Sequence, residues 1–252
     1  MHRPFAHLAP GLAALSLSLT AAPPAPAMPG CAADAMLVFD GSASMAEIGF
    51  DQSEATRIEE ARRALAQVMP GIAALRRIGL LIYGPGGTTA CSGFDLRFAP
   101  IAEAATPVVD AVAALRPDGL TPLTAAVQAA AEVLAYRSSP GLVVLVTDGN
   151  ETCGGHPCAL GQALAEDGAD LVVHVIGFRA SVDYWTWNNP EQRAGADSVA
   201  RCLADKTGGT FVRAETLEEL VEAMRSTLGC PLIGGLGRSL TATAKLSGRA
   251  PG

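Results

Sequence analysis

Residues 36–44 of this chain read Met-Leu-Val-Phe-Asp-Gly-Ser-Ala-Ser, a continuous apolar run that ends in a carboxylate, a glycine and two hydroxyl side chains. An apolar run without alternation is typical of a strand that is buried on both faces, as in a parallel sheet covered by helices. The polar residues therefore stand at the carboxyl end of a buried strand. Further strands are predicted by the same criterion at residues 79–83, 142–146, 171–176 and 210–212.

The segments between these strands have the spacing of helices. Ile58, Ala61 and Leu65 recur at intervals that place them on one helix face, and Pro70 is expected to end that helix. Residues 94–98 alternate between apolar and polar side chains and predict an antiparallel edge strand. The alternation of strands and helices predicts a doubly wound α/β fold, with a mostly parallel sheet and helices on both faces. The other helices are expected at residues 102–115, 122–136, 157–167, 196–206 and 217–228.

The composition is that of an acidic globular chain. Of its 252 residues, 49% are apolar and 17% are charged, so a sizeable core can be buried. The net charge of −7 disfavours nucleic acid as a partner, because an acidic chain repels the phosphate backbone. One domain is expected over residues 31–230, followed by a flexible C-terminal tail at residues 231–252.

Residues 1–27 are predicted to be a signal peptide rather than part of the fold. Arg3 supplies a positive start, residues 8–22 carry no charge, and residues 25–27 form a small-x-small cleavage pattern. The apolar segment is shorter than the ~20 residues of a membrane span, so no transmembrane segment is expected after cleavage. These features predict a periplasmic or secreted protein, with a lipid anchor at Cys31 as the alternative.

Polar side chains gather at the expected carboxyl ends of the strands, where ligands bind in open parallel sheets. Three follow the first strand, one opens a helix in a Thr-Pro-Leu sequence, and one follows the strand at residues 142–146. Two carboxylates and three hydroxyls are hard oxygen donors, which suit Mg²⁺, and also Mn²⁺ or Ca²⁺, rather than thiophilic metals. We predict a divalent metal site, with Mg²⁺ as its expected occupant, at Asp40, Ser42, Ser44, Thr121 and Asp148.

Such a ligand set leaves the metal under-neutralised, because three of the five donors carry no charge. An open coordination position can then accept a carboxylate from another molecule, with the metal acting as a Lewis acid. The expected partner is a protein that offers an Asp or Glu side chain.

Each element of this set also has a simpler explanation. Ser42 or Ser44 would serve equally as a helix N-cap, since a hydroxyl accepts from the free N–H groups at a helix start. Thr121 in its Thr-Pro sequence fits an N-cap followed by proline at the first helical position. Asp148 before a glycine is an ordinary turn. The occurrence of all three elements, in order and beside the expected secondary structure, favours the metal site.

The motifs at residues 40–44, 121–123 and 147–149 resemble those of the von Willebrand factor type A (VWA) family and its metal-ion-dependent adhesion site (MIDAS). The resemblance covers about residues 31–228. It implies a secreted bacterial type, in which a Cys-bearing loop follows the third motif. It also implies a binding module rather than an enzyme.

The family pattern further implies a division of labour among the predicted ligands. The three hydroxyl side chains would coordinate the metal directly. Asp40 and Asp148 would act largely through water or from behind the hydroxyls. The chain departs from the pattern at Ala43, where bacterial members often carry glycine, and this change is expected only to restrict the backbone.

Six cysteines follow the predicted signal peptide, an even number that indicates disulfides in an exported protein. The sequence alone does not fix their pairing. Cys153 and Cys158 are separated by a flexible turn that would close a small loop. Cys31 and Cys230 bracket the domain, and domain termini often lie close together. The two cysteines that remain are Cys91 and Cys202.

A zinc site is the alternative explanation for part of this set. Cys153, His156 and Cys158 are close in sequence and offer thiolate and imidazole ligands. A fourth ligand is not evident, and export favours oxidised cysteines. Disulfides are therefore the preferred prediction.

Both tryptophans of the chain fall in one polar segment. Trp185 and Trp187 follow the strand at residues 171–176, which places them on the metal side of the sheet. Aromatic side chains in a polar loop beside a ligand site are candidates for contact with a partner. The alternative is that they fold back and cover a helix.

Three functions remain open at this stage: a metal-dependent adhesion or assembly module, a metal-dependent hydrolase, and a scaffold whose metal is only structural. The hydrolase is disfavoured because the chain has no Gly-x-Ser-x-Gly sequence and no histidine in the strand-end set to act as a base. The binding module is the prediction that the family resemblance favours.

Overall fold

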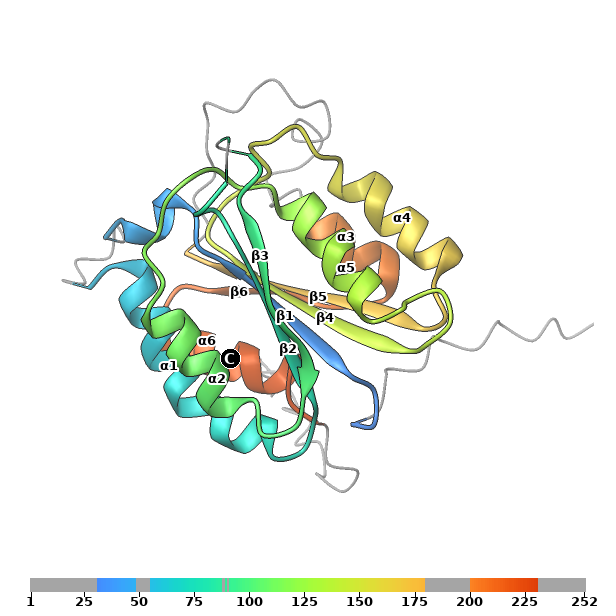
Figure 1. Cartoon of the computed structure of the whole chain (residues 1–252), viewed down its shortest axis with the longest axis horizontal. Helices are drawn as coiled ribbons and strands as arrows, with labels where there is room; N and C mark the ends of the chain where they lie inside the picture. Colours follow the sequence, from blue (N-terminus) through green and yellow to red (C-terminus); the bar gives the residue numbers. More distant parts are fainter. Residues whose placement is uncertain (1–30, 49–54, 88, 90, 180–199, 231–252) are drawn as a thin grey trace, which may run out of the picture.

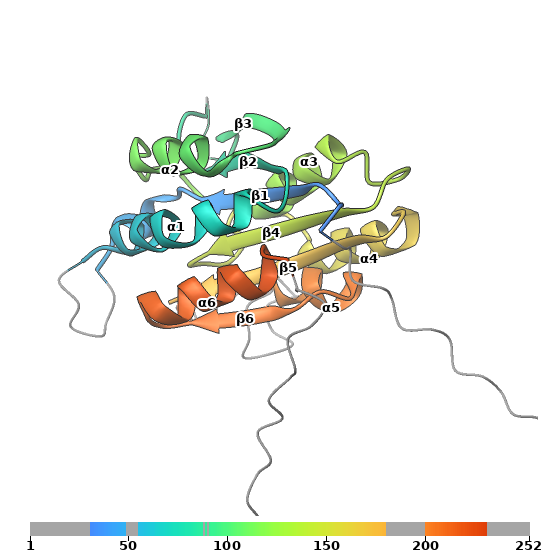
Figure 2. The ribbon, with the colours of Figure 1, turned by 90° about the horizontal axis from the view of Figure 1, so that it is seen from below.

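The strands form one six-stranded sheet in the order β3-β2-β1-β4-β5-β6, which Figure 2 shows from one edge to the other. All neighbouring strands are parallel except β3, which runs antiparallel to β2. The mixed sheet with an antiparallel edge strand confirms the predicted fold class. The computed structural model describes residues 31–48, 55–87, 89, 91–179 and 200–230. The strands are β1 (Ala35–Asp40), β2 (Ile78–Tyr83), β3 (Phe94–Ile101), β4 (Gly141–Thr147), β5 (Leu171–Phe178) and β6 (Phe211–Ala214).

Helices cover both faces of this sheet. Helices α1, α2 and α6 pack on one face, and α3, α4 and α5 pack on the other (Figure 1). Each layer encloses its own apolar cluster, so the fold has three layers with two cores. The helices are α1 (Arg57–Ala73), α2 (Ala105–Ala113), α3 (Leu123–Val133), α4 (Pro157–Asp167), α5 (Arg201–Thr207), α6 (Leu217–Thr227) and the short 3₁₀ helix η1 (Ala43–Ala46).

Strand β1 explains the unbroken apolar run in the sequence. Leu37 and Phe39 belong to the core beneath α1, whereas Met36 and Val38 belong to the core beneath α3. All four side chains have no exposed surface. Because successive side chains of a strand point to opposite faces, only a continuous apolar run can fill both cores.

The strand order also places the point where the connections diverge between β1 and β4. The chain leaves β1 for β2 on one side, and β4 later pairs with β1 on its other side. Parallel strands whose connections diverge in this way leave space between the loops at their carboxyl ends. Asp40 ends β1 and Thr147 ends β4, so the loops that follow them face each other across this point.

One helix boundary predicted from the sequence is wrong. Pro70 does not end α1, which continues to Ala73. Proline disfavours a helix interior because it lacks an N–H group. Ile72 and Ala73 lie beyond it and are each only 5% exposed, so burial of the last turn offsets the missing hydrogen bond.

His174 is a buried residue of β5 rather than a ligand of the candidate site. Its Nδ1 accepts a hydrogen bond of 2.9 Å from the backbone N–H of Thr210. Its Nε2 is buried without a hydrogen-bond partner among the described residues. Burial, together with the charge of Arg76, lowers the pKa of His174 to about 4.

This low pKa predicts an acid-dependent loss of stability. Between pH 6.5 and 4 the unfolded chain binds a proton at His174 that the folded chain does not, so the free energy of unfolding falls with pH. From pH 7.5 to 4.5 this residue is expected to contribute a loss of about 2 kcal/mol. Urea unfolding in EDTA would measure it, and His174→Gln, which keeps an acceptor for Thr210, should lose correspondingly less. Parallel pH profiles for the two proteins would contradict the prediction.

The predicted signal peptide at residues 1–27 and the predicted tail at residues 231–252 lie outside the described residues. Trp185 and Trp187 also lie outside them. Among the residues that are described, no helix is long and apolar enough to cross a membrane.

Candidate functional site

Asp40 anchors the loop that follows β1. Its side chain is fully buried. Its Oδ1 accepts a hydrogen bond of 2.8 Å from the backbone N–H of Ser42, and its Oδ2 accepts one of 2.7 Å from the hydroxyl of Thr147. Because both oxygens are held, Asp40 fixes the start of its own loop and joins it to the end of β4.

Ser42, Ser44 and Asp148 come together where the loops after β1 and β4 meet. The hydroxyl oxygens of Ser42 and Ser44 lie 3.1 Å apart. The Ser44 hydroxyl donates to Asp148 Oδ1 at 2.8 Å, although 104 residues separate the two in sequence. The fold therefore gathers two hydroxyls and a carboxylate at one point, as expected from their positions at strand ends.

Thr121 is held close to both loops by backbone contacts. The Ala43 N–H donates to the carbonyl of Gly119 at 3.2 Å, which ties the loop before α3 to the loop after β1. The Thr121 N–H donates to the hydroxyl of Thr152 at 2.9 Å, and the Thr152 N–H donates to the Thr121 carbonyl at 3.2 Å. Thr121 is thus fastened to the loop that carries Asp148.

The helix-cap explanation of these hydroxyls does not match the structure. Ser42 precedes η1 but makes no side-chain cap hydrogen bond. The N-cap position of α3 is Pro122 rather than Thr121. Glu151 supplies the missing acceptor, because its Oε2 accepts from the N–H of Thr124 at 2.9 Å. The Ser42 and Thr121 hydroxyls are therefore not committed to capping.

Thr147 and Tyr83 support the site and were not predicted from the sequence. The Tyr83 hydroxyl donates to the Thr147 hydroxyl at 3.0 Å, and Thr147 donates in turn to Asp40. Burial, and then the negative charge of Asp40, raises the pKa of Tyr83 well above its usual value, so the phenol keeps its proton. The sequence does show a hydrophobic strand that ends in Thr147 before Asp-Gly. This pattern marks the position of Thr147 but does not show which group its hydroxyl contacts.

Two buried carboxylates at the site raise the cost of negative charge. Burial, followed by the charge of Asp40, raises the pKa of Asp148 to about 7, while the Ser44 hydrogen bond and Arg57 act in the opposite direction. Arg57 Nη1 lies 3.4 Å from Asp148 Oδ2. Asp148, which directly follows β4, is therefore a carboxylate whose ionised form needs a positive charge nearby.

The donor set fits a hard divalent cation. Asp148 Oδ2 is buried and makes no hydrogen bond within the described part of the chain. A buried carboxylate oxygen without such a bond is costly, and the described residues offset that cost with the Arg57 guanidinium at 3.4 Å rather than with a hydrogen bond. The described residues contain no cluster of three or more His, Cys, Asp or Glu. Hydroxyls must therefore complete any metal site here, and hydroxyl and carboxylate oxygens suit Mg²⁺, Mn²⁺ or Ca²⁺.

The disulfides differ in part from the pairing favoured by the sequence. Cys31 pairs with Cys230, as expected for the two ends of the domain. Cys153 does not pair with Cys158. The bonds that form instead are Cys91–Cys153 and Cys158–Cys202. With these cysteines in disulfides, the structure also excludes the alternative zinc site.

Cys153 and Cys158 do not pair because helix α4 begins between them. Pro157 begins the helix, which carries Cys158 onto a helix that packs against α5. The two helices approach closely at Gly161, where an added Cβ would lie 3.1 Å from the Cys202 carbonyl. Cys153 remains in the preceding loop, and it bonds to Cys91 beyond the end of β2.

The Cys91–Cys153 bond anchors the loop that holds Thr121. Replacing both cysteines by alanine is expected to weaken metal binding roughly fivefold, because about 1 kcal/mol of loop ordering must then accompany binding. Calorimetric titration with Mn²⁺ would measure this loss. The matched control is Cys158→Ala with Cys202→Ala, which removes a bond between two helices and should leave the affinity unchanged. Equal losses in both variants would contradict a local effect.

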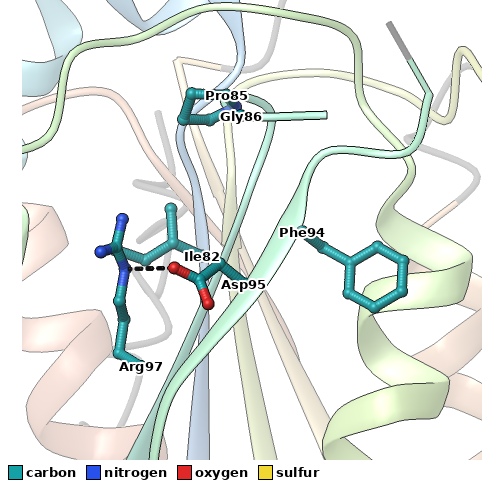
Figure 3. Close-up of a pocket in the computed structure, with 6 residues that line it drawn as sticks. All are labelled: Ile82, Pro85, Gly86, Phe94, Asp95 and Arg97. Atoms are coloured by element: carbon teal, nitrogen blue, oxygen red, sulfur yellow. Dashed lines mark ion pairs between the residues drawn. The ribbon is translucent and has the colours of Figure 1, made fainter. Parts of the chain in front are cut away.

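A separate cavity of about 340 Å³ lies where β2 passes into β3 (Figure 3). Asp95 and Arg97 form an ion pair at 3.3 Å along one side of β3, and Phe94 points to the opposite side. None of the five predicted ligands lines this cavity, which is bounded by Ile82, Pro85, Gly86, Phe94, Asp95 and Arg97.

Comparison with known proteins agrees with the fold and the motifs. The sequence profile of the von Willebrand factor type A domain matches residues 35–151, which run from β1 into the loop after β4. This segment contains all five predicted ligands. The match identifies residues 35–151 as a von Willebrand factor type A domain, a kind of domain that is typically a binding module rather than an enzyme.

Individual relatives extend the comparison. The uncharacterized protein YwmD of Bacillus subtilis (strain 168) is 26% identical over 196 residues, which cover 74% of this chain and 81% of the relative. The PilB minor pilin from Streptococcus sanguinis has a TM-score of 0.56 at 14% identity and covers 81% of this chain and 62% of its own. Proximal thread matrix protein 1 from the mussel byssus, solved with a zinc-occupied MIDAS motif, has a TM-score of 0.51 at 14% identity and covers 79% and 46%. At this level of identity, the two structures show similarity of fold alone.

Proposed function

We propose that this domain binds a divalent cation at Asp40, Ser42, Ser44, Thr121 and Asp148, and uses it to dock an acidic group of a partner protein. The observation that carries the proposal is the contact of the Ser44 hydroxyl with both the Ser42 hydroxyl at 3.1 Å and Asp148 Oδ1 at 2.8 Å. The other oxygen of Asp148 is buried and lacks a hydrogen bond among the described residues. A bound cation would supply a Lewis-acid position for a carboxylate oxygen of the partner.

Each predicted ligand has a distinct part in this proposal. The hydroxyls of Ser42, Ser44 and Thr121 would contact the cation, since the structure does not use Ser42 and Thr121 as helix caps. Asp148 orients the Ser44 hydroxyl by accepting its proton in a hydrogen bond. Asp40, held by Thr147, fixes the loop on which both serines stand.

Two of the structural neighbours favour binding over catalysis. One is a minor pilin, and another carries zinc in a MIDAS motif. We propose for this chain an adhesion or assembly role outside the cytoplasm, in the periplasm or after secretion. Three disulfides among the described residues support this location, because such bonds persist in oxidising compartments.

The test is calorimetric titration of the oxidised domain with Mg²⁺, Mn²⁺ and Ca²⁺, beside Asp40→Ala and Asp148→Ala. We expect saturable binding at one site that is lost in both variants. A cation at a hundred times its dissociation constant should add ~2.7 kcal/mol of stability, so thermal melting provides a second readout. Asp95→Ala is the matched control, because it removes an exposed carboxylate outside the site.

Absence of binding by the wild-type domain at millimolar cation would contradict the proposal. Binding of a partner that is unchanged in EDTA would favour a structural role for the metal. Turnover of simple ester or phosphate substrates, lost in Asp148→Ala, would favour a metal-dependent hydrolase instead.

A further inference from the structure

Arg57 brings a buried positive charge to the edge of the candidate metal site. It is the first residue of α1 and is only 2% exposed. Its Nη1 donates to the Ser44 carbonyl at 3.0 Å and lies 3.1 Å from Glu47 Oε2. The same nitrogen is 3.4 Å from Asp148 Oδ2. One guanidinium group therefore contacts two of the three loops that supply predicted ligands.

This position is unfavourable for a cation by ordinary helix rules. The first turn of a helix carries a partial positive charge, so arginine is disfavoured there. Burial of a guanidinium group adds a desolvation cost, and Arg57 Nε has no hydrogen-bond partner among the described residues. A residue that breaks local rules in this way tends to occur where function requires it.

The balance of buried charge indicates what that requirement is. Asp40 and Asp148 place two negative charges beside the proposed cation, and Glu151 is a third buried carboxylate, three residues beyond Asp148. Arg57 adds a further positive charge a few ångströms away. The only other charged group that contacts Arg57 in the described chain is Glu47, whose side chain is 68% exposed and is therefore screened by water.

We infer that Arg57 makes the loaded site more positive than its ligands alone would, so that the site selects an anionic oxygen ligand over a neutral one. This inference rests on the proposed function. It assigns to Arg57 two effects of opposite sign: it repels the cation, and it strengthens the attraction of the loaded site for a carboxylate. A residue that only held the loops in place would favour both steps together.

The experiment uses Mn²⁺ and acetate as probes. Mn²⁺ affinity is measured by calorimetry. Acetate binding is followed by the fall in water-proton relaxation as it displaces water from the loaded domain. Acetamide, which is neutral and of similar size, is the control ligand. Thermal melting in EDTA and in Mn²⁺ reports on folding independently of ligand binding.

The expected result for Arg57→Gln is a split between the two steps. Mn²⁺ should bind about tenfold tighter to Arg57→Gln. The reason is that the repulsion between a unit positive charge and a dication several ångströms away, in a partly solvated site, weakens binding by roughly tenfold. In Arg57→Gln, the acetate concentration that displaces half of the metal-bound water should be several times higher than in the wild type. The response to acetamide should not change. The rise in melting temperature on adding Mn²⁺ should exceed that of the wild type. Weaker Mn²⁺ binding, or an unchanged acetate response, would overturn the inference.

Two further variants separate charge from structure. Arg57→Lys keeps the charge and should retain the wild-type response to acetate, so behaviour like that of Arg57→Gln would overturn the inference. Glu47→Gln changes an exposed side chain and leaves Arg57 less compensated, which should weaken Mn²⁺ and strengthen acetate by about twofold. This variant keeps the test decisive even if Arg57→Gln does not fold. Failure of the wild type to bind Mn²⁺ would overturn the proposed function as well, whereas normal Mn²⁺ binding with no effect at Arg57 would overturn this inference alone.

Discussion

Removing the Cys31–Cys230 disulfide is expected to lower the free energy of unfolding by about 4 kcal/mol, the largest effect among the three bonds described. The bond joins residues 199 positions apart, against 62 and 44 for the other two. In the chain-entropy account, a longer closed loop restricts the unfolded chain more strongly. Urea unfolding of Cys31→Ala with Cys230→Ala, in EDTA, would measure the loss.

The matched control is the Cys158–Cys202 pair. Its removal is expected to cost about 1 kcal/mol less, because its loop is shorter. Mn²⁺ affinity should be unchanged when the Cys31–Cys230 bond is removed, since Cys31 precedes the amino end of β1 and the candidate site lies at the carboxyl end. A larger loss from the shorter loop would show that native packing around the bonds outweighs chain entropy.

The fold could be predicted because its signals are local. The apolar run at residues 36–39 predicts a strand buried on both faces, and the structure places these side chains in two different cores. The failure at Pro70 shows the limit of such reasoning. The local preference of proline was assessed correctly, but the burial of Ile72, which depends on helices far along the chain, decided where α1 ends.

The cysteine pairing shows the same limit more strongly. Nearness in sequence favoured Cys153–Cys158, yet the pairing follows which helix each cysteine stands on. Cys158 lies in α4, and its partner Cys202 comes from α5 on the same face of the sheet. Such neighbours are set by the packing of whole helices. Only the Cys31–Cys230 pair had a topological argument, the closeness of domain ends, and the structure contains it.

In the candidate site too, the residues that local sequence patterns mark could be predicted, and those that depend on contacts between distant segments could not. The predicted ligands stand at strand ends or at a helix start, which sequence patterns mark. Arg57, Tyr83 and Thr147 act through contacts between distant segments, and their residue types are unremarkable for a helix start or a strand end. The contact from Thr147 to Asp40 joins residues 107 positions apart, and nothing in either local sequence indicates it.

Thr147→Val is expected to destabilise the domain by about 3 kcal/mol and to weaken Mn²⁺ binding about tenfold. The side chain is 1% exposed, and its hydroxyl both donates to Asp40 at 2.7 Å and accepts from Tyr83 at 3.0 Å. Valine has nearly the same shape but leaves a buried carboxylate oxygen and a buried phenol without these bonds. Loss of partners for buried groups costs more than the bonds themselves contribute. Asp40 would then be free to turn, and the loop that carries Ser42 would lose its anchor.

Two controls isolate the hydroxyl. Thr147→Ser keeps the hydrogen bonds and should stay within about 1 kcal/mol of the wild type, with normal Mn²⁺ affinity. Tyr83→Phe removes only the outer bond and should cost about 1 kcal/mol, because Thr147 still holds Asp40. Urea unfolding in EDTA gives the stability, and calorimetry gives the affinity. If Val and Ser behave alike in both measurements, the contact between Thr147 and Asp40 does not organise the site, and the loop after β1 must be held by its backbone contacts to Gly119 instead.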